Sequence, residues 1–107
     1  MKMSEVIELV RVVLPKGRHA GVNVYLLPRL MSVEELCLAE SWAKFVLAEE
    51  VAQHLWIAFI DEEPELSWEH RSRLLLIDDD IAEVLMDLSV HFPPSFYADM
   101  QLLSPVE

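Results

Sequence analysis

The sequence predicts an α+β fold: a mainly antiparallel sheet of about four strands with two main helices packed on it. Residues 55–60 and 71–77 are short, apolar and rich in aliphatic or aromatic side chains, as buried strands are. Residues 33–53 and 81–92 instead repeat their apolar positions with the period of a helix. Two strands precede each helix, an order typical of α+β proteins. With 107 residues, the chain is predicted to form one domain over residues 1–107.

The first two expected strands cover residues 6–14 and 22–27. Both glycines of the chain, Gly17 and Gly21, lie between them, which indicates a loop and therefore an antiparallel hairpin. Residues 5–14 also fit a helix, because Glu5 and Glu8 recur with a three-residue spacing. We adopt the strand interpretation and leave the helix open.

The helix expected over residues 33–53 has a clear beginning. Ser32 is a preferred N-cap residue, and Glu35 follows three positions later, as in a capping box. Two apolar stripes run along this helix, and the second contains Trp42 and Phe45. This second stripe either packs within the molecule or forms a surface for a partner.

The second expected helix follows Asp80 as its N-cap and ends before Pro93. Its apolar face is formed by Ile81, Val84, Leu85 and Leu88. The tail after residue 94 fits either a short helix or an edge strand, and we adopt the helix.

Charge restricts the classes of partner. The chain has 19 acidic and 8 basic residues and a net charge of −11, and residues 32–107 hold seventeen of the acidic residues. This charge disfavours nucleic acids and anionic membrane surfaces. The single cysteine, Cys37, forms no internal disulfide and suits a reducing compartment, and no segment looks like a signal peptide. We therefore expect a cytoplasmic protein.

No motif for catalysis or for a cofactor is present in the sequence. The four histidines are not spaced as zinc ligands, and no nucleophile motif with nearby glycines occurs. We therefore predict no catalytic residues, no metal site and no cofactor. A metal-dependent hydrolase built from Asp61, Glu63, His70 and Asp78 remains the alternative from a different functional class.

The acidic segment at residues 61–69 has the composition of a partner-binding surface. Five carboxylates surround one tryptophan in this segment, and tryptophan is enriched at the energetic centres of interfaces. A solvated loop is the competing interpretation. The residues predicted to bind a partner are Asp61, Glu62, Glu63, Glu65, Trp68, Glu69, Asp78, Asp79, Trp42 and Phe45.

These observations lead to a functional hypothesis. We expect a protein-binding domain that neutralises a basic protein, in the manner of an immunity protein or antitoxin that blocks a nuclease toxin. The alternative within binding proteins is a small acidic secretion chaperone that forms a homodimer and holds an effector through Trp42 and Phe45.

Overall fold

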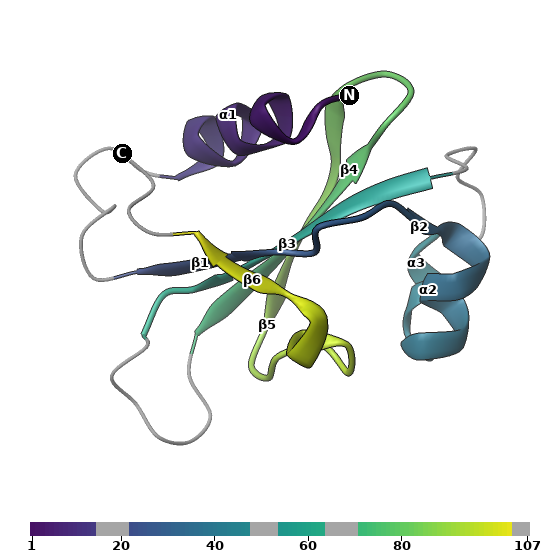
Figure 1. Ribbon diagram of the computed structural model, residues 1–107. Helices are drawn as coiled ribbons and strands as arrows, with labels where there is room; N and C mark the ends of the chain where they lie inside the picture. The colour runs from purple at the N-terminus through teal and green to yellow at the C-terminus, as the bar shows by residue number, and fades with distance from the viewer. Residues whose placement is uncertain (15–21, 48–53, 64–70, 104–107) are drawn as a thin grey trace.

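The computed structural model describes residues 1–14, 22–47, 54–63 and 71–103, and one antiparallel sheet is its central element (Figure 1). The strand order is β5-β4-β3-β1-β6, and β2 pairs with β3. The strands are β1 Asn23–Leu26, β2 Met31–Ser32, β3 His54–Asp61, β4 Ser72–Asp78, β5 Glu83–Val90 and β6 Gln101–Leu103. The expected α+β class with an antiparallel sheet is confirmed, with six described strands where about four were predicted.

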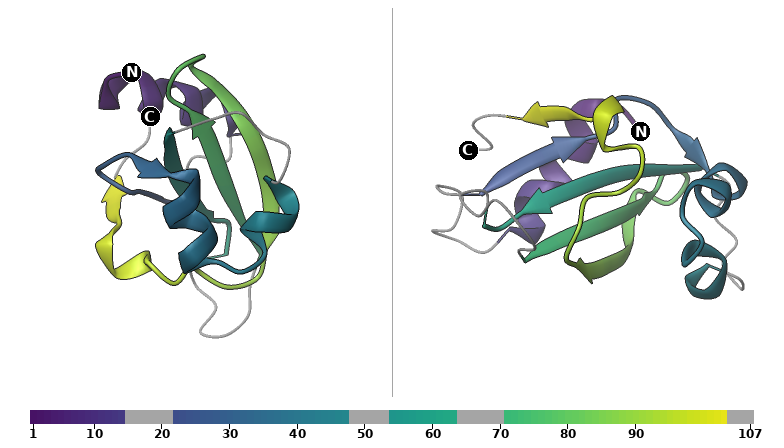
Figure 2. Two further views of the ribbon diagram at one scale, coloured as in Figure 1. Left: turned by 90° about the vertical axis from the view of Figure 1, so that its right-hand side faces the viewer. Right: turned by 90° about the horizontal axis from the view of Figure 1, so that it is seen from below.

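The two faces of the sheet are covered by different segments (Figures 1 and 2). Helix α1, Met3–Val13, covers one face and packs against side chains such as Leu75 and Ile77. Helices α2, Val33–Ala39, and α3, Ala43–Val46, pack on the other face together with the segment that follows β5. β3 is buried at every position after His54, because it lies in the middle of the sheet between both layers.

The N-terminal segment is a helix, so the strand adopted for residues 5–14 is wrong and so is the hairpin with residues 22–27. Val6, Val10 and Leu14 are buried at a spacing of four residues, which places them on one helical face against the sheet. The Glu5 carboxylate accepts the backbone N–H of Lys2 at 2.8 Å and satisfies a free donor at the beginning of α1. The β-branched composition of this segment was a weaker indicator than its period.

The long helix predicted over residues 33–53 is interrupted. Its beginning is confirmed, because the Ser32 hydroxyl accepts the Glu35 N–H at 3.0 Å. Glu40 then takes an extended conformation, and its carboxylate accepts the Ser95 N–H at 2.6 Å. The Ser95 hydroxyl donates to the Ala39 carbonyl at 3.1 Å, so a distant segment satisfies the end of α2. Residues 48–53 lie outside the described residues.

The second predicted helix is wrong, because residues 83–90 form β5. Leu76 pairs with Met86 and Ile77 pairs with Val84, so Leu85 is an extra residue in a β-bulge. The bulge shifts the alternation of the strand by one residue. Apolar side chains before and after it therefore show a spacing that imitates a helix.

The tail contains a short 3-10 helix, Tyr97–Asp99, followed by the edge strand β6, so the helix adopted for this region is wrong and the edge strand is correct. The strands predicted over residues 55–60 and 71–77 are confirmed as β3 and β4. None of the helices in the described residues has the length and apolar character needed to cross a membrane.

Candidate functional site

The predicted acidic site is divided between two ends of the sheet. Asp61 ends β3 opposite Ser72, whereas Asp78 ends β4 opposite Leu55. Six residues of strand separate these two ends, a distance of about 20 Å. Glu65, Trp68 and Glu69 lie outside the described residues. The acidic residues predicted as one surface therefore belong to at least two places.

At the first end, Asp61 and Glu63 have structural roles. Asp61 is 8% exposed, and its carboxylate accepts the Glu63 N–H at 3.1 Å. The Glu63 carboxylate accepts the Arg71 N–H at 2.7 Å. Glu62 is partly buried, and its N–H donates to the Arg71 carbonyl at 3.1 Å. These bonds hold the ends of β3 and β4 together.

At the second end, the carboxylates of Asp78 and Asp79 also accept hydrogen bonds within the molecule. Asp78 is 5% exposed and accepts the N–H groups of Asp80 and Ile81 at 2.8 and 3.4 Å. Asp79 accepts from the amino-terminal ammonium of Met1 at 2.9 Å and from the Trp56 indole at 2.8 Å. The ammonium first, and then the indole, lower the pKa of Asp79. The carboxylate of Asp79 is therefore stabilised in its charged form.

The second stripe of the region after Ser32 is only partly buried. Trp42 packs against the core, but Phe45 is 80% exposed and Leu38 is 86% exposed. The Lys44 ammonium lies 5.6 Å from the centre of the Phe45 ring. Phe45 is therefore exposed, as a contact residue would be, whereas Trp42 is partly buried against the core.

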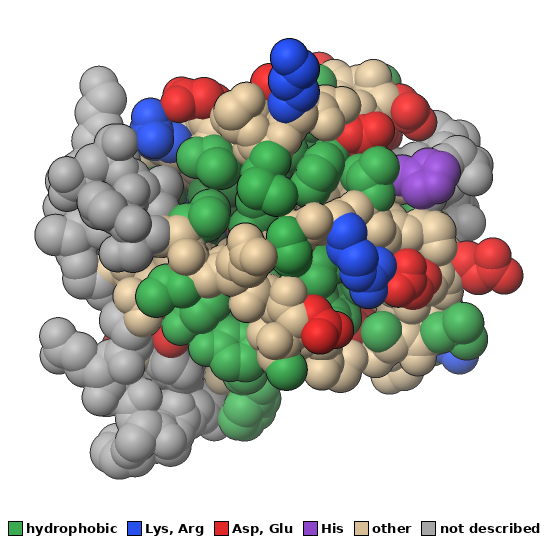
Figure 3. Space-filling view, viewed as in Figure 1, with side chains coloured by type: hydrophobic (Ala, Val, Ile, Leu, Met, Phe, Trp, Pro, Cys, Tyr) green, Lys and Arg blue, Asp and Glu red, His purple; other side chains and the backbone are tan. Residues whose placement is uncertain are grey.

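Negative charge is spread over the face seen in Figure 3. Apolar side chains cover much of this face, and Asp and Glu side chains lie along its upper and right-hand edges and also among the apolar side chains below the centre. All four arginines of the described part of the chain pair with carboxylates, as Arg11 does with Glu8 and Arg29 with Glu35. These pairs neutralise the guanidinium groups locally, so carboxylates outside these pairs give the described part of the chain its excess of negative charge.

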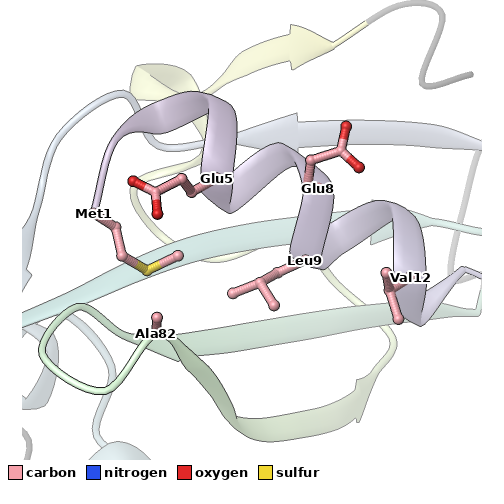
Figure 4. Close-up of a pocket in the computed structure, with 6 residues that line it drawn as sticks. All are labelled: Met1, Glu5, Glu8, Leu9, Val12 and Ala82. Carbon is pink, nitrogen blue, oxygen red and sulfur yellow. The ribbon is translucent and has the colours of Figure 1, made fainter.

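An open groove lies between α1 and the β4–β5 turn (Figure 4). It has a volume of about 320 Å³ and is lined by Met1, Glu5, Glu8, Leu9, Val12 and Ala82. Figure 4 shows the side chains of Leu9 and Met1 pointing towards the β4–β5 hairpin, while Glu5 and Glu8 project from other sides of α1. The groove therefore combines an apolar floor with carboxylates on its rim.

The β4–β5 turn adds negative charge beside this groove. The pKa of the Met1 ammonium is raised, mainly by its hydrogen bond to Asp79. The nearby charges of Glu5 and Asp80 raise it further. Asp80 is exposed, so its carboxylate lies at the surface near the amino terminus. In the described residues, Glu5 and Asp80 form no ion pair with a side chain. We call Glu5, Glu8 and Asp80 the acidic rim. Of these three, Glu5 and Asp80 can bind cationic groups without first breaking an ion pair, whereas Glu8 is paired with Arg11.

Sequence reasoning missed this groove. Its walls are α1 and the turn before β5, two regions for which the adopted secondary structure was wrong. The available signal was the spacing of Glu5 and Glu8, which places both carboxylates near one face of a helix. The helical interpretation that was left open for residues 5–14 would have led to it.

Away from the groove, Tyr25, Phe59 and Tyr97 form an aromatic cluster in which the two tyrosine side chains are hydrogen-bonded. The rings of Tyr25 and Tyr97 meet edge to face with 5.0 Å between their centres. The hydrogen bond with Tyr25, with smaller effects of burial and of the Asp61 charge, raises the pKa of Tyr97 to about 12. This group therefore favours folding below pH 10, its ordinary pKa, and the contribution is lost as pH rises through about 12.

Replacing Tyr25 with Phe is expected to lower the pKa of Tyr97 towards 10, because the hydrogen bond that is the main cause of the shift disappears. Tyr97 is then the only tyrosine in the chain, so the absorbance of tyrosinate as a function of pH measures it directly. An unchanged titration in the Tyr25→Phe protein would contradict the assigned cause.

Among the described residues, no three His, Cys, Asp or Glu side chains are grouped as they would be around a metal ion. Asp61 and Asp78, which the hydrolase alternative places in one site, lie at the opposite ends described above. No family model matches the chain, and comparison with curated proteins and with solved structures gave no match.

Proposed function

We propose that this chain is a protein-binding domain that neutralises a basic protein partner in the cytoplasm. The observation that supports this proposal best is the apolar groove lined by Glu5 and Glu8, with Asp80 near the amino terminus beside it. Carboxylates in this arrangement bind the Arg and Lys groups with which a nuclease-type toxin would hold phosphates. The mode of action is that of an immunity protein or antitoxin.

Both the apolar floor of the groove and its carboxylates suit basic side chains. Arg and Lys have aliphatic stems that cover apolar surface while their charged ends stay at the edge. Here the stems would lie on Leu9 and Val12, of which Val12 is 80% exposed. The charged ends would reach the acidic rim and form charge-assisted hydrogen bonds, which are about twice as strong as neutral ones.

A secretion chaperone is the second candidate, and the exposure of Leu38 and Phe45 supports it. Two large apolar side chains on neighbouring helices are suited to hold an unfolded apolar segment. This candidate predicts a homodimer and client binding that depends little on salt, whereas a partner bound by charge dissociates as the salt concentration rises.

The proposed function is tested by co-purification from native cells at low and high salt, with the groove variant Glu5→Gln, Glu8→Gln, Asp80→Asn. We expect a basic partner that binds one-to-one. The groove variant should bind this partner about tenfold more weakly at low salt, because it loses three rim charges. Calorimetry with the purified partner measures the change.

The matched control is Glu34→Gln, Glu35→Gln, Asp99→Asn. It removes the same number of charges as the groove variant. Each of the two variants includes one carboxylate that pairs with an arginine: Glu8 with Arg11 in the groove variant and Glu35 with Arg29 in the control. Unchanged affinity in this control, together with loss in the groove variant, supports the proposal. An acidic partner, or equal losses in both variants, contradicts it. A third variant, Glu62→Gln, Glu65→Gln, Glu69→Gln, tests the acidic segment that the sequence indicated.

A further inference from the structure

β5 lies at one edge of the sheet. It has eight residues, it pairs with β4 on one side, and within the described residues no strand pairs with its other side. The opposite edge strand, β6, has only three described residues. An outermost strand presents unpaired N–H and C=O groups, which are a template for a further strand. β5 is therefore the long open edge in the described part of the molecule.

The two faces of β5 differ in chemistry. Met86, Leu88 and Val90 are partly buried and pack against the core on the face that α2 and α3 cover. Asp87 and Ser89 lie between them in the alternation, so they point to the face that α1 covers. Asp87 accepts the Arg73 Nε–H at 3.0 Å and remains exposed. The edge thus offers an apolar row on one face and a polar row, Asp87 paired with Arg73 and Ser89, on the other.

The polar row of β5 and the groove lie on the same face of the sheet. α1, which carries Glu5, Glu8, Leu9 and Val12, packs on this face, and the groove reaches the hairpin at Ala82, directly before β5 (Figure 4). A strand added to β5 would therefore direct every second side chain to the side of α1 and its acidic rim. The remaining side chains would lie beside Met86 and Leu88.

We propose that the basic partner binds as an extended segment that pairs with the open edge of β5 and alternates basic and apolar residues. This inference rests on the proposed function and specifies the conformation of the partner. The basic side chains face α1, and the apolar side chains extend the row of Met86, Leu88 and Val90. Main-chain hydrogen bonds supply affinity, and the two rows supply specificity.

The β-bulge limits where the segment pairs. Leu85 interrupts the regular alternation, so regular pairing is confined to Met86–Val90. A second copy of this chain is a poor occupant, because the side chains that its own β5 would add on the α1 face, Asp87 and Ser89, are not basic. A basic segment instead brings cations to the side of Glu5 and Glu8.

The test uses a synthetic peptide of alternating Lys and Val, blocked at both ends, and two versions with N-methyl groups on alternate backbone amides. One version carries the methyl groups on the Lys residues and the other on the Val residues. In a strand, successive N–H groups point to opposite edges, so only one version blocks pairing with β5. We expect that version to bind at least about tenfold more weakly and the other to bind within about twofold of the parent.

Hydrogen exchange locates the contact. Amides in residues 86–90 should become protected when the parent peptide binds, while those of β6 should not change. If both methylated peptides bind equally, or if β5 gains no protection, the inference is wrong. The co-purification experiment would still test the proposed function, because its result does not depend on the conformation of the partner. A homodimer that the peptide dissociates would also overturn the inference, by making a second copy the occupant.

Discussion

Replacing Phe59 with Ala is expected to destabilise the fold by about 3–5 kcal/mol. Phe59 is 1% exposed in the central strand β3. Its ring lies 6.1 Å from that of Tyr25 and 5.9 Å from that of Tyr97, measured between centres. Its removal leaves a cavity that its neighbours in the sheet cannot fill, because β3 is held on both sides by paired strands. A domain of this size has a free energy of unfolding of about 5–15 kcal/mol, so the loss is a large fraction of it.

Urea denaturation measures this effect, and Phe45→Ala is its control. Phe45 is 80% exposed, so its replacement should change the free energy of unfolding by no more than about 0.5 kcal/mol. The comparison keeps the chemistry of the substitution constant and changes only burial. Equal effects of the two substitutions would show that Phe59 does not lie in the core.

Replacing Asp78 with Ala is expected to cost about 1–3 kcal/mol, because a buried acceptor is removed. Its carboxylate accepts two N–H groups in the β4–β5 turn, those of Asp80 and Ile81. The same turn holds Ala82 at a φ of 56°, a conformation that is unfavourable for a residue with a Cβ atom. The bonds to Asp78 help to fix the backbone in this state.

Thermal denaturation with two further variants tests this role. Asp78→Asn keeps an oxygen acceptor and should recover most of the lost stability. Asp80→Ala changes an exposed side chain of the same turn and should cost no more than about 0.5 kcal/mol. If Asp78→Ala and Asp80→Ala have equal effects, general charge and not the hydrogen bonds of Asp78 determines the stability of the turn.

The sequence predicted the inner strands well because their composition matches their surroundings. β3 and β4 are buried on both faces, so continuous apolar runs identify them without knowledge of their neighbours. The beginning of α2 was equally clear, since the Ser32 cap is a local interaction.

The outer elements were predicted poorly because their patterns depend on contacts with distant residues. The bulge at Leu85 gives β5 a spacing that imitates a helix, and it exists only in the pairing with β4. The end of α2 is fixed by Ser95, which lies 55 residues from Glu40. The groove requires both α1 and the β4–β5 turn in place, so no single segment of the sequence reveals it.

The sequence by itself determined the antiparallel α+β class, the inner strands, the cap at Ser32 and the excess of acidic residues. Only the tertiary structure decided where that charge lies. It gives Asp61, Glu63 and Asp78 hydrogen bonds within their turns, joins Asp79 to Met1 and Trp56, and places Glu5 and Glu8 at a groove beside Asp80. The physical reason is that backbone preferences and net charge follow from nearby or summed residues, whereas the neighbours of a carboxylate depend on how distant segments pack.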